Sequence, residues 1–510
     1  MTSVVTWLDR LLGRVTMYVL VIICLAALAV VAAVLSLLGW FGFGPLELLA
    51  SSAVLLAVAY GANRLAGLIL RMRPQTGSAA ITALLLLFIF QPTLDPLGLA
   101  WLGLAALVAT ASKYLLAMRG RHVFNPAALG AFVVGLLPVL SGTFVVWWPG
   151  TAVMLPFTAV AAFLILFRTR KLLMGATFIA VATLTWSAWY AINGFGAGFV
   201  DGLSFALLAY PTVFFAGFML SEPLTLPPRR RQQLIEAVVV GLLFGVSFNL
   251  AGVVSASPQL ALLVGNLLAF AFGQRRGIRL ELLGRTALSP TSWELEFAPV
   301  HPVRFTPGQY LELTLPHDRT DARGWRRVFS IASAPGDGSR LRVGIRVPER
   351  PSAFKRALLE LEPGATVSAT SVGGDFVLPA DGSRVLLVAG GIGITPFVAQ
   401  LEQLAAEGSS RDVVLVYAVR DGADLAYASR LAKTPCRVIV VAPQRPAQLP
   451  RGWRWAAAER LTGEQLVELV PDVSQRRVLL SGSPTWVGEL RRALRAAGAR
   501  RIHTDVFLGY

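Results

Sequence analysis

Long apolar runs fill the first half of the chain, whereas the second half alternates between short apolar and polar stretches. A helix needs about 20 mostly apolar residues to cross the hydrocarbon core of a bilayer. The runs define ten segments of roughly that kind, at residues 15–38, 46–69, 79–90, 97–112, 127–147, 151–167, 172–190, 203–220, 233–253 and 258–273. The pattern predicts a polytopic α-helical membrane domain over residues 1–275. The third segment ends at Gln91-Pro92, which predicts a broken or tilted helix there.

Basic residues of the first half and its boundary lie at alternate ends of these segments. They are Arg10, Arg14, Arg64, Arg71, Arg73, Lys113, Arg119, Arg121, Arg168, Arg170, Lys171, Arg229, Arg230, Arg231, Arg275, Arg276 and Arg279. The intervening connections lack Lys and Arg and contain Asp95 and Asp201 instead. By the positive-inside rule, both termini and the second half are expected on the cytoplasmic side of the cell inner membrane. The first run is a full span, so no cleavable signal peptide is expected.

The composition is typical of a membrane protein and excludes some cofactors. Mean hydropathy is +0.63 and only 15% of residues are charged, which is too apolar for a soluble chain. Much of the net charge of +17 comes from the basic connections described above, and the other basic residues are scattered. Nucleic-acid binding is therefore not expected. Cys24 and Cys436 are the two cysteines, which excludes a four-cysteine iron–sulfur cluster within this chain and argues against disulfides. The first 275 residues contain only His122, so paired haem ligands are absent and haem is not expected. No metal site is predicted.

The second half falls into two regions with different patterns. Residues 276–380 show short strands with turn punctuation, which predicts a small antiparallel β-barrel. Residues 381–510 alternate strands with helices, which predicts a parallel sheet covered on both faces. The strands expected there are 385–389, 413–419, 437–441 and 477–481.

The first of those strands runs into a glycine-rich turn that precedes a helix. The turn reads Gly390-Gly391-Ile392-Gly393-Ile394-Thr395-Pro396. Backbone N–H groups in such a turn can approach a pyrophosphate at the start of the helix. A tight turn that needs glycine only for its geometry would look the same.

The order of these regions resembles the ferredoxin–NADP reductase superfamily, over about residues 278–510. Arg327-Val328-Phe329-Ser330 is similar to the R-x-Y-S motif of that family, with Phe in place of Tyr. The resemblance implies that Arg327 binds a flavin phosphate, Phe329 packs on the flavin and Ser330 hydrogen-bonds near flavin N5. Further FAD-binding positions implied are Tyr310, Val328, Ser352, Gly373 and Gly374.

The same resemblance implies an NAD(P)H site. Its dinucleotide turn would be formed by Gly390, Gly391, Gly393, Thr395 and Pro396. The stretch Ser481-Gly482-Ser483-Pro484 is similar to the C-G-x-P motif, and Ser481 replaces the cysteine. Without that thiol, hydride transfer would depend on close approach and alignment.

Two features of the NAD(P)H site are left open by the sequence. Tyr510 ends the chain and, as in many relatives, would cover the isoalloxazine ring; a frayed polar end is the alternative. Arg420 and Arg445 would favour NADPH, but Asp421 and Asp424 lie close by and favour NADH.

Two motifs in the first half resemble the membrane-embedded B component of sodium-pumping NADH:quinone reductase and the D component of the Rnf complex. One is Gly120-Arg121-His122-Val123-Phe124-Asn125-Pro126-Ala127-Ala128, and the other is Phe218-Met219-Leu220-Ser221-Glu222-Pro223-Leu224-Thr225, in which Glu222 replaces an Asp. Read by physics alone, Asn125 and Pro126 form a good helix start after a cytoplasmic loop.

The resemblance implies a second flavin, FMN or riboflavin, in the membrane domain. The residues that would bind it are Arg121, His122, Asn125, Pro126, Ser221, Glu222 and Thr225. Some relatives attach FMN covalently at an S-G-A-T segment. Here Ser141-Gly142-Thr143 is incomplete and Met174-Gly175-Ala176-Thr177 lies beside a cytoplasmic loop, so a non-covalent flavin is favoured. Proline breaks after the third and eighth segments hint at two inverted five-helix repeats.

These features together predict a transmembrane oxidoreductase. Electrons would pass from cytoplasmic NADH or NADPH through FAD and the membrane flavin to an extracytoplasmic FMN-binding redox protein or to a quinone. An intermediate cofactor is expected because the hydrocarbon layer is about 30 Å thick. The alternatives are an ion-translocating NADH:quinone reductase and a transporter whose reductase domain senses redox state. Only membrane lipid, nucleotide and redox partners are expected.

Overall fold

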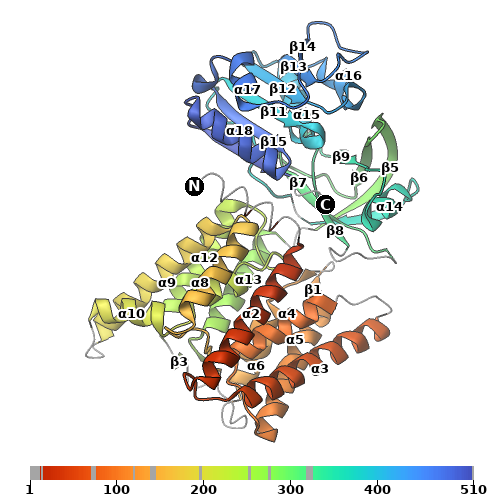
Figure 1. Cartoon of the computed structure of the whole chain (residues 1–510). Coiled ribbons are helices and arrows are strands. Elements are labelled where there is room, and N and C mark those ends of the chain that lie inside the picture. Colours follow the sequence, from red (N-terminus) through yellow and green to blue (C-terminus); the bar gives the residue numbers. More distant parts are fainter. Residues whose placement is uncertain are drawn as a thin grey trace. The chain divides into compact units, whose positions relative to one another are not determined.

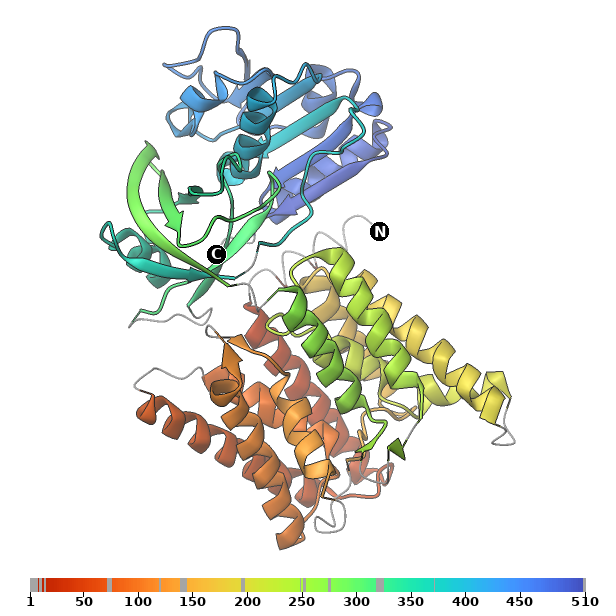
Figure 2. The same cartoon turned by 180° about the vertical axis from the view of Figure 1, so that it is seen from behind.

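The computed structural model describes residues 8, 12, 15–70, 76–118, 121–137, 145–193, 198–247, 249–250, 254–273, 277–317, 325–370 and 372–507. The chain forms two compact units, one of Arg14–Arg275 and the other of Arg276–Tyr510 together with Met1–Gly13. We call them the helical unit and the α/β unit. They are coloured red to light green and green to blue in Figures 1 and 2.

Helices account for almost all the regular structure described in the helical unit. They are α2 (Met17–Leu37), α3 (Pro45–Ile69), α4 (Thr76–Ile89), α5 (Pro96–Leu115), α6 (Pro126–Gly135), α8 (Leu155–Arg168), α9 (Leu172–Asn193), α10 (Phe199–Leu208), α11 (Thr212–Phe214), the π-helix η1 (Phe215–Met219), α12 (Arg230–Gly245) and α13 (Pro258–Phe272). Two short hairpins join them, β1 (Ala117–Met118) with β2 (Arg121–His122) and β3 (Asn249–Leu250) with β4 (Val254–Ser255).

Fewer helices have spanning length than the sequence predicted. Among the described residues, α2, α3, α5 and α9 are long and apolar enough to cross a membrane, and the bent pair α10 with α11–η1 would make a fifth. The helices α4, α6, α8 and α13 are apolar but shorter. Each predicted segment therefore contains a helix, whereas ten full spans are not confirmed.

Proline accounts for two of these differences. The fifth segment was expected to be helical over 127–147, but α6 ends at Gly135, three residues before Pro138. Proline disfavours the helical conformation in the residue before it. The eighth segment was expected to be one helix over 203–220, but it bends by 56° between α10 and Thr212, where Pro211 has no N–H to donate.

The α/β unit begins with an antiparallel sheet of six strands in the order β8-β7-β10-β5-β6-β9. The strands are β5 (Ile278–Ser289), β6 (Ser292–Pro299), β7 (Tyr310–Thr314), β8 (Arg326–Ser330), β9 (Leu341–Arg346) and β10 (Thr366–Ala369), with helix α14 (Ala353–Leu359) before the last. The outer strands meet at a bridge between Ile331 and Val343, and Ala332 N donates to Arg342 O. A fully closed barrel stays a prediction.

A parallel six-stranded sheet follows in the order β14-β13-β12-β11-β15-β16. The first five of these strands are labelled in Figure 1. Its strands are β11 (Val385–Gly390), β12 (Val413–Ala418), β13 (Arg437–Ala442), β14 (Arg454–Ala457), β15 (Arg477–Gly482) and β16 (Ile502–Val506). The helical elements between them are the 3₁₀ turn η3 (Gly391–Ile394), α15 (Thr395–Ala406), η4 (Gly422–Asp424), α16 (Ala428–Leu431), α17 (Gly463–Leu469), η5 (Val473–Gln475) and α18 (Pro484–Ala496).

This sheet is buried on both faces, as the apolar runs in its strands require. Along β11, Val385 and Leu387 enter one hydrophobic core with Phe397 of α15, while Leu386 and Val388 enter the opposite core with residues of α17 and α18. The predicted parallel sheet is therefore confirmed.

Candidate functional site

The parallel sheet places two glycine turns side by side. The chain leaves β11 towards β12, β13 and β14 on one side and returns to β15 and β16 on the other. In open α/β sheets, ligands bind outside the carboxyl ends of the strands where the strand order reverses in this way. Ala389 of β11 pairs with Ser481 of β15 at this point. Both predicted nicotinamide motifs therefore meet at the switch point.

Glycine is required at two positions of these turns for different reasons. Gly391 has a φ of +55°, a conformation that side chains rarely adopt. A Cβ on Gly393 would lie 2.6 Å from the carbonyl oxygen of Ser481, so the two turns approach too closely for a side chain. Thr395 donates from Oγ1 to Ile392 O at 3.1 Å, and Pro396 lies in the first turn of α15. The result is a tight glycine turn at a helix start, which suits a pyrophosphate.

Ser481 has a buried hydroxyl without a hydrogen-bond partner in the part of the chain that the structure describes. Buried hydroxyls are normally hydrogen-bonded, and one that is not indicates a ligand or a functional role. Gly482 follows it, and Pro484 starts α18. These features fit a nicotinamide nucleotide at the carboxyl ends of β11 and β15.

The predicted flavin-phosphate residue, Arg327, lies on β8 with only 3% of its surface exposed. Its guanidinium carbon is 5.1 Å from the centre of the Phe354 ring in α14. The ring of Phe329 also stacks on Phe354, with the centroids 6.1 Å apart, and belongs to the core of the antiparallel sheet. Arg327 and Phe329 therefore both contact the ring of Phe354. Contact of Phe329 with a flavin stays a prediction.

Tyr310, Ser330 and the Gly373-Gly374 turn form a second part of the predicted flavin site. Tyr310 and Ser330 are direct partners in the β7–β8 ladder. The backbone of Tyr310 exchanges hydrogen bonds of 2.9 and 3.0 Å with Gly373. Gly374 has a φ of +98°, and a Cβ there would lie 2.9 Å from the Tyr310 ring. The structure therefore brings these four predicted residues together, with backbone where a side chain would be excluded.

The remaining residues that the sequence singled out in this unit have different settings. Ser352 is the N-cap of α14 and accepts a hydrogen bond from Lys355 N at 3.3 Å. Val328 is 43% exposed on β8. Tyr510 lies outside the described residues, so its predicted covering role is untested. Asp424 accepts hydrogen bonds from Ser289 of β5 and from Thr291 in the turn before β6, so its carboxylate already has partners there.

Asp505 was missed from the sequence. It lies on β16 as the direct partner of Ser481 on β15. Burial, together with the nearby Asp375 carboxylate, raises the pKa of Asp505 to about 6. Asp375 follows Gly374 directly in the chain. Asp505 therefore lies between the proposed nucleotide turn at Ser481 and the predicted flavin turn at Gly374. Only the parallel pairing of β15 with β16 identifies it, because no motif marks the position.

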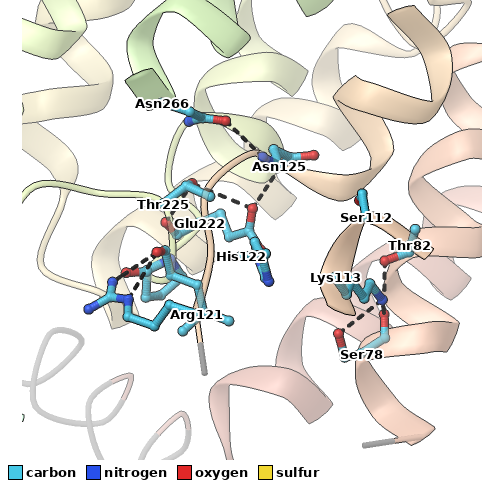
Figure 3. A network of polar contacts seen from close by, with 12 residues as sticks. Ser78, Thr82, Ser112, Lys113, Arg121, His122, Asn125, Glu222, Thr225 and Asn266 are labelled. Carbon is cyan, nitrogen blue, oxygen red and sulfur yellow. Dashed lines mark hydrogen bonds and ion pairs between the residues drawn. The ribbon is translucent and has the colours of Figure 1, made fainter. Parts of the chain in front are cut away.

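In the helical unit, the two motifs meet in one polar network (Figure 3). Asn125 Nδ2 donates to Glu222 Oε2 at 2.9 Å, and His122 Nε2 lies 2.8 Å from Glu222 Oε1. Arg121 donates to the backbone carbonyls of Pro223 and Leu224, at distances from 2.8 to 3.1 Å. His122 and Asn125 are buried, with 6% and 1% of their surfaces exposed. The turn after η1 and the start of α6 are therefore joined by side chains from both motifs.

Asn266 of α13 completes this network and was not predicted. Its Oδ1 accepts a hydrogen bond of 2.7 Å from Asn125 N. Its Nδ2 has no partner within the described residues, although the side chain is buried. A buried amide donor of this kind suits a carbonyl oxygen of a ligand.

The other predicted residues have local structural roles as well. Asn125 accepts from Ala128 N at 3.0 Å and caps α6, with Pro126 in the first turn. Ser221 Oγ donates to Gly217 O at 2.6 Å, and Thr225 Oγ1 donates to Glu222 O at 3.3 Å. Of the two covalent-flavin candidates, Ser141-Gly142-Thr143 lies outside the described residues, and Thr177 donates to Leu173 O within α9.

Comparison with known proteins finds similarity in the α/β unit. Residues 387–483 match the oxidoreductase NAD-binding domain family. The ferredoxin reductase component of 3-ketosteroid-9-alpha-monooxygenase from Mycolicibacterium smegmatis is 31% identical over 211 residues, covering 40% of this chain and 56% of the relative. The reductase subunit of an aromatic O-demethylase from Amycolatopsis is 31% identical over 218 residues, covering 40% of this chain and 62% of the relative. The chain thus spans about three fifths of the curated relatives it matches.

Solved structures with similarity include the Amycolatopsis cytochrome P450 reductase, which is 27% identical with a TM-score of 0.39 and covers 46% of this chain and 70% of that chain. The sequence similarity supports the predicted NAD(P)H-dependent flavin oxidoreductase activity. The C-terminal part of this chain is a ferredoxin-reductase-like FAD/NAD-binding domain that contains an oxidoreductase NAD-binding domain at residues 387–483.

Proposed function

We propose that this protein is a transmembrane oxidoreductase that takes electrons from cytoplasmic NAD(P)H and passes them through FAD and a second flavin to an acceptor across or within the membrane. The observation that carries the proposal is the meeting of the Gly390–Gly393 turn and the Ser481–Pro484 turn at the switch point of the parallel sheet. The relatives of this region are named as reductase components of oxygenase systems.

In the α/β unit, FAD when bound would accept one hydride, which carries two electrons, and would release these electrons singly. Arg327 would hold a flavin phosphate, because a guanidinium is permanently charged and offers forked donors. Ser330 and Tyr310 would lie along the flavin edge beside the Gly374 backbone. The turn at Gly391 and Gly393 would hold the nucleotide pyrophosphate, and Ser481 would donate its free hydroxyl to the nicotinamide side.

In the helical unit, the network of His122, Asn125, Glu222 and Asn266 would bind the second flavin. Asn266 Nδ2, which has no partner within the described residues, would supply a donor and Glu222 would supply acceptors, which suits the alternating carbonyl and N–H edge of an isoalloxazine. The four long apolar helices support an inner-membrane location. The placement of basic connections supports a cytoplasmic position for this network and for the reductase domain.

The acceptor decides between this proposal and its alternatives. An extracytoplasmic FMN-binding redox protein would need electrons delivered to the far face, whereas a quinone would take them within the bilayer. An ion-translocating reductase would couple turnover to Na⁺ or H⁺ uptake. A transporter with a redox-sensing domain would move no electrons through its helical unit.

The test uses the full-length protein in sealed vesicles, with NADH supplied on the cytoplasmic face. We expect reduction of a soluble dye outside and of an impermeant acceptor trapped inside. Changing Asn125 or Glu222 to Ala should lower only the second activity, because both residues lie in the helical unit. Reduction of a membrane quinone without the trapped acceptor would favour the quinone. Dye reduction alone would refute electron transfer through the helical unit.

A further inference from the structure

Arg430 in the short helix α16 contacts three separate segments of the α/β unit. Its Nε and Nη2 donate to the two carboxylate oxygens of Glu402 at 2.6 and 2.7 Å. Its Nη1 donates to Glu294 of β6, and Nη2 also donates to Ala332 O at 2.8 Å. The side chains of Arg430 and Glu294 are only 19% and 12% exposed. One guanidinium is thus largely enclosed by its partners.

The partners of Arg430 lie in elements that belong to both proposed sites, the one for NAD(P)H and the one for FAD. Glu402 lies on α15, the helix that begins at the glycine-rich turn. Ala332 follows Ser330 of the flavin motif by two residues, and Glu294 lies on β6 of the same antiparallel sheet. Arg430 therefore ties the helix that would carry the nicotinamide nucleotide to the segment that would carry the flavin.

A second contact at the same place is made by Tyr427, the residue before α16. Tyr427 has a φ of +64°, which is uncommon for a residue with a side chain. A Cβ on Gly344 of β9 would lie 2.4 Å from the Tyr427 hydroxyl oxygen and 2.6 Å from the Thr395 methyl carbon. Gly344 is also the register partner of Glu294. The close approach of Tyr427 to Gly344 and the hydrogen bond of Arg430 to Glu294 therefore hold the same two segments together.

The chemistry of the contact requires arginine. A guanidinium offers forked donors that satisfy the Glu402 carboxylate with two parallel bonds and still reach Glu294 and the Ala332 carbonyl. A lysine ammonium would keep the charge but could not hold this geometry. With Arg430 removed, two partly buried carboxylates would lose their common counter-charge.

We propose that Arg430 is a positioning residue that sets the distance between the nicotinamide turn and the flavin motif, and so controls hydride transfer without touching either nucleotide. The inference rests on the proposed NAD(P)H and FAD sites. Hydride transfer depends steeply on approach, and a misplacement of about 1 Å can cost roughly a hundredfold in rate.

The experiment measures flavin reduction in the full-length protein by stopped flow, at saturating NADH and with NADH deuterated at the transferred position. We expect Arg430→Ala to lower the limiting rate roughly tenfold to a hundredfold. FAD content should be unchanged and the isotope effect should increase. Arg430→Lys should recover part of the rate. Arg460→Ala is the matched control, because Arg460 pairs with Glu489 on the exposed surface of the same domain.

A second variant tests the same contact if Arg430→Ala does not fold. Gly344→Ala keeps all the charges and disturbs the contact from the side of β9, so it should lower the limiting rate in the same way. Wild-type rates in Arg430→Ala, or in Gly344→Ala should Arg430→Ala not fold, would overturn the positioning role alone. A wild-type protein that oxidises neither NADH nor NADPH would overturn the proposed function and this role with it.

Discussion

Glu222 Oε1 lies 2.8 Å from His122 Nε2, although the two residues are 100 positions apart in the chain. The same carboxylate accepts from Asn125 through its other oxygen. A carboxylate between two buried partners holds both in place, since removing it would leave buried donors unsatisfied. The pair therefore joins the start of α6 to the turn that follows η1.

Changing Glu222 to Gln tests whether this network binds a flavin. An amide offers one acceptor where the carboxylate offered two, so it cannot serve His122 and Asn125 equally. We expect flavin in purified full-length protein to fall from two per chain towards one, with FAD retained. Glu47→Gln, at the start of α3, is the control and should keep both flavins. An unchanged ratio would place the second flavin elsewhere.

Purified protein should contain no haem. The prediction follows from the single histidine of the first 275 residues, which cannot supply a pair of axial ligands. A pyridine haemochrome spectrum measures it directly. Haem b in stoichiometric amount would contradict the proposed route through flavins.

Arg327→Ala should weaken FAD binding. The substitution removes a permanent charge from the proposed phosphate site, and a hydrogen bond to a charged group is worth about 1.5–3 kcal/mol, or roughly ten- to a hundredfold in affinity. Titration of the apoprotein with FAD provides the measurement. Arg340→Ala is the control, because Arg340 is an exposed partner of Glu296. Equal affinities would refute the assignment of Arg327.

Ser481→Ala should separate stability from activity. The hydroxyl is buried without a partner among the described residues, so its removal should leave the thermal midpoint unchanged or slightly higher. If that hydroxyl serves the nicotinamide, the rate of flavin reduction by NADH should fall severalfold. Ser410→Ala, at an exposed position in the loop after α15, should alter neither quantity. A clear loss of stability in Ser481→Ala would indicate a structural role for the hydroxyl.

Asp505 should make the α/β unit less stable as the pH rises. Its pKa is about 6 in the folded chain, against an ordinary value of 3.8, so the folded state keeps a proton that the unfolded state loses. Stability should therefore fall between about pH 4 and pH 6 and then level off, by about 3 kcal/mol. Asp505→Asn should lack this dependence and exceed the wild type above pH 6. Denaturant unfolding of residues 276–510 across this range would show it, and parallel curves for both proteins would contradict it.

Prediction from the sequence was strongest where local pattern fixes local structure. Alternation of apolar strands with helices predicted β11, β12, β13 and β15 close to their observed bounds. It did not predict β14 or β16, because Arg454–Ala457 is mostly exposed and Ile502–Val506 mixes apolar with polar residues, so neither strand has a buried apolar run. Continuous helix lengths in the first half were overestimated, because α6 ends at Gly135 and the eighth segment bends by 56° at Pro211, although both stretches of sequence are apolar.

The sequence by itself determined the two kinds of unit and the residues of each motif. Those properties depend on neighbours in the chain, such as a glycine that allows a positive φ or a proline that stops a helix. Only the tertiary structure decided which motifs meet. Asn266, Asp505 and Arg430 carry no local signal, and they reach Asn125, Ser481 and Ala332 through helix packing, strand order and a close contact at a glycine. Such contacts join residues far apart in the chain, and no local pattern encodes them.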